Sequence, residues 1–380
     1  LVLLRIPTTI MSREAIFEAS LDYFLGPIRE FLHDETVTEV MVNGHDEVYI
    51  ERRGRLIRTD ASFASPDALL SAVRNVAQYV GREIDEDRPI LDARLPDGSR
   101  VHVVIPPSAR IGTYLTIRKF QRDIMGLGDF VRLGSLSEVA REFLELCVVL
   151  RKNIVVAGGT GTGKTTMLNA MSTAIPEDER IVVIEDSSEL RLSQTHCLYL
   201  ESLQADRQGE GGLGIRELFR ASLRMRPDRI LVGEVRGGEA LDMVQSMISG
   251  HSGSLTTVHA TSPRDALVRL ETLSLMSDVE LPIYVARAQV ASAIHLVVQL
   301  SRFSEDGSRK VTRITEVFGL DESNRYQSQD LFVSRLTGRD DQGMLTADLS
   351  PTGNRPTFAD ELSEYGLEEH VRLTRSIWQA

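Results

Sequence analysis

The sequence has no apolar run long enough to cross a membrane as a helix. Such a helix needs roughly 18 apolar residues, whereas the apolar start at residues 1–4 is ended by Arg5 and Pro7. No small-residue cleavage site follows it, so we expect a chain that is not exported. Cysteine is also scarce: Cys147 and Cys197 have no Cys-x-x-Cys motif and no histidine cluster beside them. This predicts two buried thiols, no zinc site and a reducing, cytoplasmic compartment.

The chain also lacks an excess of basic residues. Its formal net charge is −12, from 43 Lys and Arg against 55 Asp and Glu. This balance opposes non-specific binding of nucleic acid through released counterions, so nucleic acid is not the expected partner, although a local basic patch would still allow it. The 380 residues, with 42% apolar and 26% charged side chains, are typical of a globular protein with two domains and a tail.

Residues 11–120 have the pattern of a smaller α+β domain. Apolar residues recur at helical spacing over 12–33, and short β-favouring runs follow on both sides of Asn43-Gly44. A helix is predicted to begin at Ser65-Pro66 and to end at Gly81. Strands are expected again at 101–105 and 114–117. Residues 1–10 are left out of this prediction.

Residues 121–136 are rich in glycine and have little periodicity, which predicts a linker. From 137 onward, helices alternate with apolar strands expected at 154–157, 181–185, 230–233 and 255–258. This alternation predicts an α/β domain over 137–320, with a mostly parallel sheet and helices on both faces. A hairpin is expected around Asp306-Gly307. Residues 321–380 are polar and irregular and are predicted to be a C-terminal extension.

The strongest motif is a complete phosphate-binding loop between a predicted strand and a predicted helix. Its glycines let backbone N–H groups turn toward a β-phosphate, and the helix N-terminus points at the same place. The lysine reaches the β- and γ-phosphates, and the threonine hydroxyl after it is the natural Mg²⁺ ligand. ATP and Mg²⁺ are therefore the expected ligands. The nucleotide-binding residues are Gly158, Gly159, Thr160, Gly161, Thr162, Gly163, Lys164, Thr165 and Thr166.

Acidic residues follow two predicted strands of the same domain. Glu185 and Asp186 come at the end of the strand at 181–185, and Glu234 follows the strand at 230–233. Hydrolysis requires a carboxylate that orients or activates water, and strand ends are where such groups lie in this architecture. Gly233 stands where many P-loop enzymes have a metal-associated aspartate.

Two histidines and six arginines lie around these motifs. His251 and His259 flank the strand at 255–258, and we expect both at the same edge of the sheet, hydrogen-bonding to phosphate or to the carboxylates. A metal site from this pair alone is not expected, because a third ligand is missing. A guanidinium stabilises a transferring phosphate well, but most of the six are expected to be ion-paired or solvated: Arg216, Arg220, Arg224, Arg226, Arg229 and Arg236.

Taken in order, five motifs resemble those of the type II/type IV secretion ATPase superfamily. They are the Walker A loop at 158–165, the Asp box at 184–186, the arginine-rich stretch at 223–229, the Walker B segment at 233–236 and the His box at 250–260. The resemblance runs from about Thr36 to about Leu320.

The resemblance implies a ring-shaped homohexamer with a RecA-like core, in which nucleotide lies between the two domains. It implies that Glu234 is the catalytic carboxylate, with Glu185 and Asp186 assisting at water and at Mg²⁺, Asp186 indirectly. Arg100, in Gly-Ser-Arg-Val, and Arg118, in Thr-Ile-Arg-Lys, look like the N-domain arginines that approach phosphate.

Within the superfamily, the tail resembles CpaF-type ATPases of Tad/Flp pilus systems, at 330–333 and in Pro-Thr-Gly-Asn-Arg-Pro at 351–356. Two departures are Ser202, where the subfamily usually has an arginine nearby, and Thr261, where asparagine is common. The resemblance implies a motor at the cytoplasmic face of the inner membrane, acting on a platform protein and through it on pilin or secreted protein. The alternatives are a DNA-translocating conjugation ATPase and a nucleotide-gated scaffold.

Overall fold

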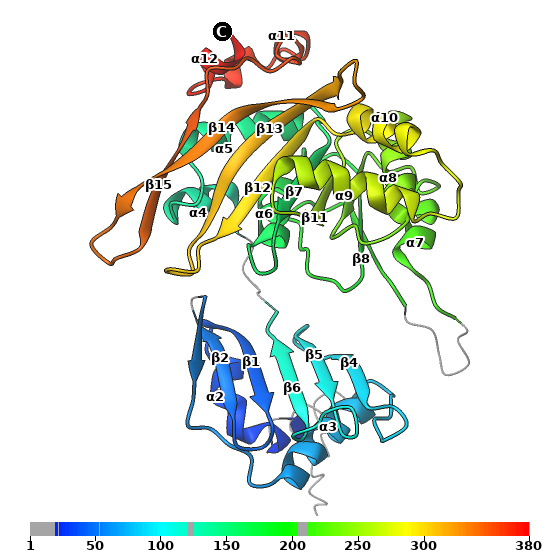
Figure 1. The fold of residues 1–380 in the computed structure, drawn as a ribbon, viewed down its shortest axis with the longest axis vertical. Helices are drawn as coiled ribbons and strands as arrows, with labels where there is room; N and C mark the ends of the chain where they lie inside the picture. The colour runs from blue at the N-terminus through cyan, green and yellow to red at the C-terminus, as the bar shows by residue number, and fades with distance from the viewer. Residues whose placement is uncertain (1–19, 22, 53, 121–124, 204–210, 380) are drawn as a thin grey trace, which may run out of the picture. The chain divides into compact units, whose positions relative to one another are not determined.

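The computed structural model describes residues 20–21, 23–52, 54–120, 125–203 and 211–379 (Figure 1). The chain divides into two compact units, residues 1–122 and 123–380, and each is described by itself. Residues 12–19 and 22 of the helix predicted over 12–33 lie outside the described residues. In its described part, Gly26-Pro27 starts a short 3-10 helix, η1 (Gly26–Ile28), and α2 (Arg29–His33) follows. No helix of the described residues is long and apolar enough to span a membrane.

The first unit is built on a six-stranded antiparallel sheet in the order β3-β2-β1-β6-β5-β4. Its helix α3 (Pro66–Tyr79) begins with the Ser65 hydroxyl accepting the Ala68 N–H at 3.2 Å, as the Ser-Pro signal predicts. Apolar side chains of α2 and α3 pack with alternate residues of the strands into one core. The strands are β1 (Val37–Asn43), β2 (Val48–Arg52), β3 (Arg55–Arg58), β4 (Ile90–Arg94), β5 (Arg100–Val104) and β6 (Tyr114–Arg118).

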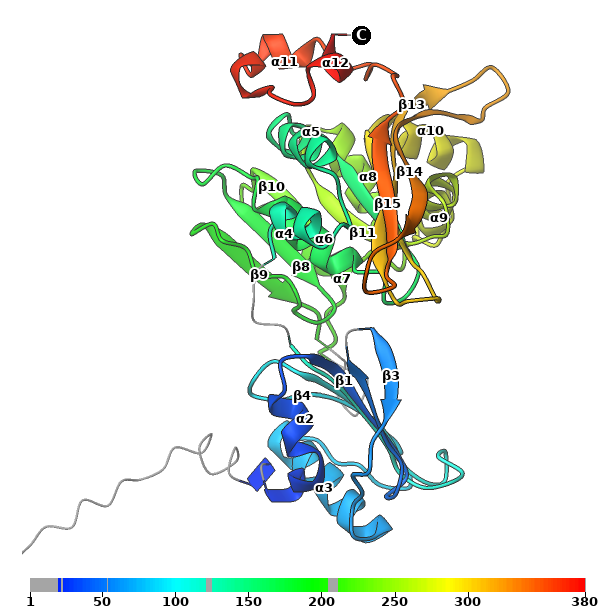
Figure 2. The same cartoon turned by 90° about the vertical axis from the view of Figure 1, so that its left-hand side faces the viewer.

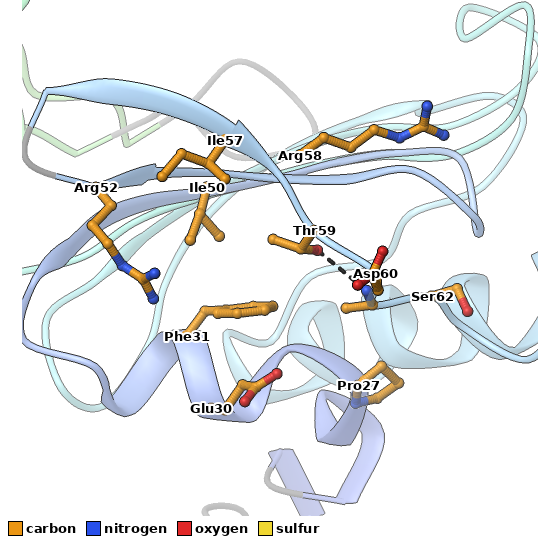
Figure 3. Close-up of a pocket in the computed structure, with 11 residues that line it drawn as sticks. Pro27, Glu30, Phe31, Ile50, Arg52, Ile57, Arg58, Thr59, Asp60 and Ser62 are labelled. Carbon is orange, nitrogen blue, oxygen red and sulfur yellow. Dashed lines mark hydrogen bonds between the residues drawn. The ribbon is translucent and has the colours of Figure 1, made fainter.

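A shallow pocket of this unit lies between α2 and the β2–β3 hairpin (Figure 3). Phe31, Ile50 and Ile57 form its apolar wall. Its two arginines already have carboxylate partners: Arg52 pairs with Asp34 at 2.7 Å, and Arg58 pairs with Glu47 at 3.2 Å. Both arginines that line the pocket are therefore already paired with carboxylates, and we assign the pocket no ligand.

The second unit is built on a nine-stranded sheet in the order β15-β14-β13-β12-β7-β11-β10-β8-β9 (Figure 1). The six strands from β12 to β9 are parallel, and β13, β14 and β15 are added antiparallel at one edge. The mostly parallel sheet predicted from the alternation is confirmed. The strands are β7 (Ile154–Gly158), β8 (Ile181–Glu185), β9 (Cys197–Glu201), β10 (Arg229–Val232), β11 (Leu255–His259), β12 (Leu296–Arg302), β13 (Arg309–Leu320), β14 (Tyr326–Arg339) and β15 (Leu345–Pro351).

Helices cover both faces of this sheet, and Figure 2 shows α9 and α10 on the side opposite to α4 and α5. One core joins α4, α5, α6 and the C-terminal segment to the sheet, and the other joins α7, α8, α9 and α10 to it. The central strands β7 and β8 are buried and apolar up to their last residue, as expected for parallel strands covered on both faces. The helices are α4 (Leu127–Arg132), α5 (Glu138–Val149), α6 (Lys164–Ser172), α7 (Ile215–Ser222), α8 (Glu239–Ile248), α9 (Pro263–Leu275) and α10 (Ile283–Ala293).

Two segments differ from their predicted character. Leu127 and Phe130 of α4 are buried in the core of the second unit, although residues 121–136 were expected to form a linker. Beyond Leu320 the chain was expected to be irregular, yet β14 and β15 extend the sheet. Two short helices follow, α11 (Glu361–Glu364) and α12 (Arg375–Trp378). Trp378 of α12 stacks on Phe143 of α5 at a centroid distance of 5.2 Å.

The two cysteines both lie in the second unit. Cys147 is fully buried in α5, as predicted, whereas Cys197 at the start of the edge strand β9 is half-buried.

Candidate active site

The carboxyl ends of the parallel strands bring the predicted site residues to one edge of the sheet. Gly158 ends β7, and the register pairs it with His259 at the end of β11. Glu185 ends β8, and Glu234 stands two residues beyond the end of β10. Since β8, β10, β11 and β7 are neighbours in the sheet, one edge receives the phosphate loop, two carboxylates and a histidine. This is the edge at which open α/β sheets bind ligands.

The phosphate loop has the backbone that its glycines predict. Gly161 and Gly163 adopt positive φ values of 69° and 91°, which glycine alone adopts without strain. A Cβ on Gly158 would lie 2.9 Å from the carbonyl oxygen of Leu300, so a side chain is excluded there. The Thr162 hydroxyl donates to the Gly159 carbonyl at 2.9 Å and ties the loop to itself. The loop then enters α6, which presents its N-terminus to the same point.

A chain of contacts runs from the loop lysine to the carboxylates. Lys164 Nζ donates to the Gly159 carbonyl at 3.0 Å and lies 3.4 Å from the ring nitrogens of His259. His259 Nε2 lies 2.9 Å from one oxygen of Glu234, and an Arg236 Nη donates to the other at 2.6 Å. A second Nη of Arg236 lies 3.4 Å from the Asp186 carboxylate. The lysine is thus two contacts away from the candidate catalytic carboxylate.

His259 is placed to link these groups in its neutral form. Desolvation by the surrounding protein, followed by the charge of Lys164, lowers the pKa of His259 below its ordinary value of 6.5. A neutral ring with its proton on Nε2 donates to Glu234 and leaves Nδ1 as an acceptor for Lys164. The predicted hydrogen-bonding role of His259 toward a site carboxylate fits this geometry.

Glu185 is the buried carboxylate of the site, and backbone N–H groups hold it. Its side chain is buried, and one oxygen accepts the backbone N–H groups of Glu189 at 2.9 Å and Leu190 at 3.0 Å. Gly233 of the neighbouring strand end leaves the space it needs, because a Cβ there would stand 2.9 Å from Glu185 Cγ. Gly233, which stands where many P-loop enzymes have a metal-associated aspartate, is therefore explained by the close packing of Glu185 against it.

The expectation for His251 was wrong. It lies before β11, whereas His259 ends that strand, so the two histidines flank opposite ends of one strand and lie at opposite edges of the sheet. The backbone N–H of His251 donates to Ser246 O at 3.0 Å, and its carbonyl accepts the Ser254 hydroxyl at 3.1 Å. The two ends of a strand lie at opposite edges of its sheet. Residues just before and just after a short strand are therefore close in the sequence but far apart in space.

The six arginines near the motifs serve different purposes. Arg216 and Arg220 both donate to Asp242, at 2.7 and 2.9 Å. Arg229 is buried and pairs with Glu179 at 2.5 Å, at the amino end of β10. Arg236 is the member of the group that contacts the site carboxylates. The expectation that most of these arginines are ion-paired holds for these four.

The two N-domain arginines lie side by side in the first unit. Arg100 of β5 and Arg118 of β6 are cross-strand partners at one end of the small sheet, and Arg118 also pairs in register with Glu39 of β1. Cross-strand partners have Cβ atoms about 5 Å apart, so the two guanidinium groups share one surface.

Two arginines at the site escaped the sequence reasoning. Arg309 Nε donates to the Gly161 carbonyl at 2.7 Å, and Arg302 Nη1 lies 3.2 Å from where a Cβ on Gly161 would stand. Both come from the β12–β13 hairpin. Its position next to the phosphate-loop strand would have revealed them, but strand order is not readable from the sequence.

The residues present fit a magnesium ion that is held chiefly by nucleotide phosphates. Thr165 stands in the first turn of α6, and Glu185 and Asp186 stand at the carboxyl end of β8, at the same edge of the sheet. Within the described ranges, His, Cys, Asp and Glu side chains form no group of three or more that would hold a metal unaided. Magnesium keeps several waters and binds through phosphates and one or two protein oxygens, which is the donor set this edge offers.

Comparisons with known proteins show what this chain is similar to. Residues 24–335 match the family model described as type II/IV secretion system protein. The chain is 37% identical over 329 residues to the type IV secretion system protein PtlH of Bordetella pertussis, covering 79% of this chain and 95% of PtlH. It is 33% identical over 303 residues to the conjugal transfer protein TrbB of Rhizobium radiobacter, covering 78% of this chain and 88% of TrbB.

The fold agrees as well. The ATPase DotB of Yersinia pseudotuberculosis superposes with a TM-score of 0.56 at 16% identity, over 84% of this chain and 83% of DotB, a likeness that concerns the fold alone. The family model matches most of this chain, and one relative is 37% identical to it. The chain therefore belongs to the type II/IV secretion system protein family.

Proposed function

We propose that this protein is a Mg²⁺-dependent ATPase that converts ATP and water to ADP and phosphate and so powers a secretion or pilus-assembly machine. The observation that carries the proposal is the contact chain from Lys164 of the phosphate loop through His259 to Glu234. A phosphate-binding cation and a water-orienting carboxylate are thereby joined at one edge of the sheet, which is what phosphoryl transfer to water requires.

The residues divide the work as follows. Lys164 exchanges its contacts with Gly159 and His259 for the β- and γ-phosphates, and the loop N–H groups hold the same phosphates. Glu234 orients the attacking water and accepts its proton, while His259 and Arg236 hold that carboxylate in place. The rigid Glu185 and the more exposed Asp186 act on the waters around the ion. Magnesium, when bound, neutralises charge that develops on the phosphate oxygens.

Arg100 and Arg118 are proposed to approach the same nucleotide from the first unit, in a homohexameric ring. What supports this is their shared surface position together with the family membership. Replacing either arginine by alanine is expected to lower ATP turnover while leaving the unfolding temperature of the free protein unchanged.

At the finer level we propose a CpaF-type motor of a Tad/Flp pilus, supported by the tail motifs at 330–333 and 351–356. It would be cytoplasmic, associate peripherally with the inner membrane, and act on a platform protein and through it on pilin or secreted protein. A pull-down with the platform protein of such a system, compared with the platform of a conjugation system, tests this assignment.

The second candidate is a DNA-translocating conjugation or type IV secretion ATPase. The relatives TrbB, named for conjugal transfer, and PtlH, named for type IV secretion, favour it, whereas the net charge of −12 opposes direct contact with DNA. Turnover that rises on addition of DNA and loses this stimulation steeply with salt would select the second candidate over the first.

Hydrolysis itself is tested by phosphate release from three variants. Lys164→Ala is expected to abolish ATP binding and turnover. Glu234→Gln is expected to retain binding and lose at least about a hundredfold in kcat. Glu280→Gln, the same change at an exposed position between α9 and α10, is the matched control and should behave as wild type. Full turnover by the first two variants would refute the proposal.

A further inference from the structure

The β12–β13 hairpin carries two arginines past the end of the phosphate-loop strand. β12 runs parallel to β7, and Leu300 lies beside Gly158, whose Cβ would stand 2.9 Å from the Leu300 carbonyl. β12 continues two residues further to Arg302, and the register pairs Arg302 with Arg309 at the start of β13. Each strand of the hairpin therefore carries one arginine beyond the end of β7, next to the phosphate loop.

The register explains why both arginines face the loop. After Gln299 the pairing with β13 shifts by one residue, so that Leu300 pairs with Val311. Both of these side chains are buried. Because every second residue of a strand shares a face, Arg302 and Arg309 continue the buried face of Leu300 and Val311. A bulge beside an active site commonly re-aims side chains in this way.

The hairpin is a rigid support for these arginines. The Ser135 hydroxyl donates to the Arg309 carbonyl at 2.5 Å, and the Val311 N–H donates to the Ser135 carbonyl at 2.9 Å. Lys310 is buried and donates from Nζ to the Gly134 carbonyl at 3.0 Å. The start of β13 is thus fixed to the connection between α4 and α5 at Arg309 and at the two residues that follow it. A side chain on such a support is placed accurately.

The contact that matters is made to a peptide group of the loop. Arg309 Nε donates to the Gly161 carbonyl at 2.7 Å. The peptide between Gly161 and Thr162 is planar and trans, so its N–H points away from the carbonyl. With the carbonyl held by Arg309, the Thr162 N–H is directed away from the hairpin. Gly161 itself, at φ 69°, has no side chain that would fix this orientation.

We propose that Arg309 is a positioning residue for phosphate binding: its hydrogen bond fixes the Gly161–Thr162 peptide so that the Thr162 N–H faces the nucleotide phosphates. Arg302, next to it, adds positive charge beside the same loop. This inference rests on the proposed nucleotide site. It assigns to that site a residue that belongs to none of the motifs: not the phosphate loop, the Asp box, the Walker B segment or the His box.

Two substitutions separate the hydrogen bond from the charge. Arg309→Gln keeps an N–H donor at the position of Nε but removes the charge, and Arg309→Met keeps the length but has no donor. ATP binding with Mg²⁺ is measured by calorimetry, and KM and kcat by phosphate release. Arg335→Met, at an exposed position of β14 in the same sheet, is the matched control.

Arg309→Met is expected to raise the Kd and KM for ATP about tenfold or more, the effect of one lost charge-assisted hydrogen bond. Its kcat should stay within about twofold of wild type, because a ground-state contact is removed. Arg309→Gln should stay within about threefold of wild type in Kd. The unfolding temperature without nucleotide should change little in either variant, which separates positioning from a merely structural role.

Three results would overturn the inference: wild-type affinity in the Met variant, equal losses in the Gln and Met variants, or a loss of kcat with KM unchanged. These outcomes are distinct from failure of the proposed function. If the wild-type protein binds no ATP or does not hydrolyse it, the proposed function fails before any variant is compared.

Discussion

Gly233→Ala tests whether the position of Glu185 matters for catalysis. The new Cβ would stand 2.9 Å from Glu185 Cγ and 3.3 Å from Oε1, whereas ordinary contacts begin at 3.4 Å. The side chain must therefore move by about 0.5 Å, and the atom that is struck is in its middle, with the carboxylate held by the N–H groups of Glu189 and Leu190. Such overpacking costs about 1–3 kcal/mol of stability.

The effect on turnover follows from the same displacement. A shift of about 1 Å in a catalytic group costs about 10²-fold in rate, so about half that shift is expected to lower kcat about tenfold. ATP affinity should change little, because the phosphate loop belongs to a different strand. Phosphate release gives kcat, calorimetry gives the Kd, and urea unfolding gives the free energy.

The matched control is Gly128→Ala. Gly128 is exposed in α4, and a methyl group added to it would meet no atom within 4 Å, so this change should leave kcat unchanged and stabilise the helix by about 0.5–1 kcal/mol. A Gly233→Ala protein with wild-type kcat would refute the assignment of Glu185 to the water or ion of the site.

Three further changes have expected outcomes. Burial alone would raise the pKa of Glu142, but hydrogen bonds from Thr374 and from three backbone N–H groups of the tail outweigh it and lower the pKa. The stabilisation from this shift is present above the unfolded pKa of about 4.3 and is lost as pH falls through the folded value, so the fluorescence of the single tryptophan, Trp378, should shift red in acid. Glu142→Gln should lower the free energy of unfolding by about 2–3 kcal/mol at pH 7. Gly253 has a φ of 83°, and the methyl group of Gly253→Ala would collide with the buried guanidinium of Arg229. Denaturant unfolding should show that the free energy of unfolding falls by about 3–5 kcal/mol. Protonation of His259, whose pKa is lowered, should give kcat an acid limb below pH 6.5 that is absent in the His259→Asn variant.

Four of the six parallel strands were predictable because each of them carries a local signal, whereas β9 and β12 were not predicted. Residues 154–157 and 181–184 are apolar runs, and 255–258 is the β-favouring segment Leu-Thr-Thr-Val. Helical patterns lie between them, and this sequence of elements permits few arrangements. The strands β14 and β15 were not predictable in the same way. They are half-exposed additions to a sheet edge, with polar residues on one side, and their stability comes from pairing with β13 and not from their own composition.

The site was predictable where its residues are consecutive or stand at strand ends. The phosphate loop, Glu185 and Glu234 needed only strand positions, because parallel strands align their carboxyl ends. His251 failed because adjacency in sequence was taken for adjacency in space across a strand. Arg309 was missed because its contact with Gly161 spans 148 residues and depends on β12 lying next to β7, an order that the sequence does not state.

The contacts of Lys164 bear on how a bound phosphate group would be coupled to Glu234, the proposed catalytic carboxylate. Its distances to His259 are 3.4 Å, long for hydrogen bonds, and a charge-assisted bond to phosphate is stronger than either. Binding ATP would therefore draw the lysine off His259, whose ring keeps its contact with Glu234 at 2.9 Å. Loss of the adjacent positive charge removes one cause of the lowered pKa of His259, while its ring continues to contact Glu234. Occupancy of the phosphate loop and the contacts of Glu234, the proposed water-orienting carboxylate, would in this way be linked through one histidine.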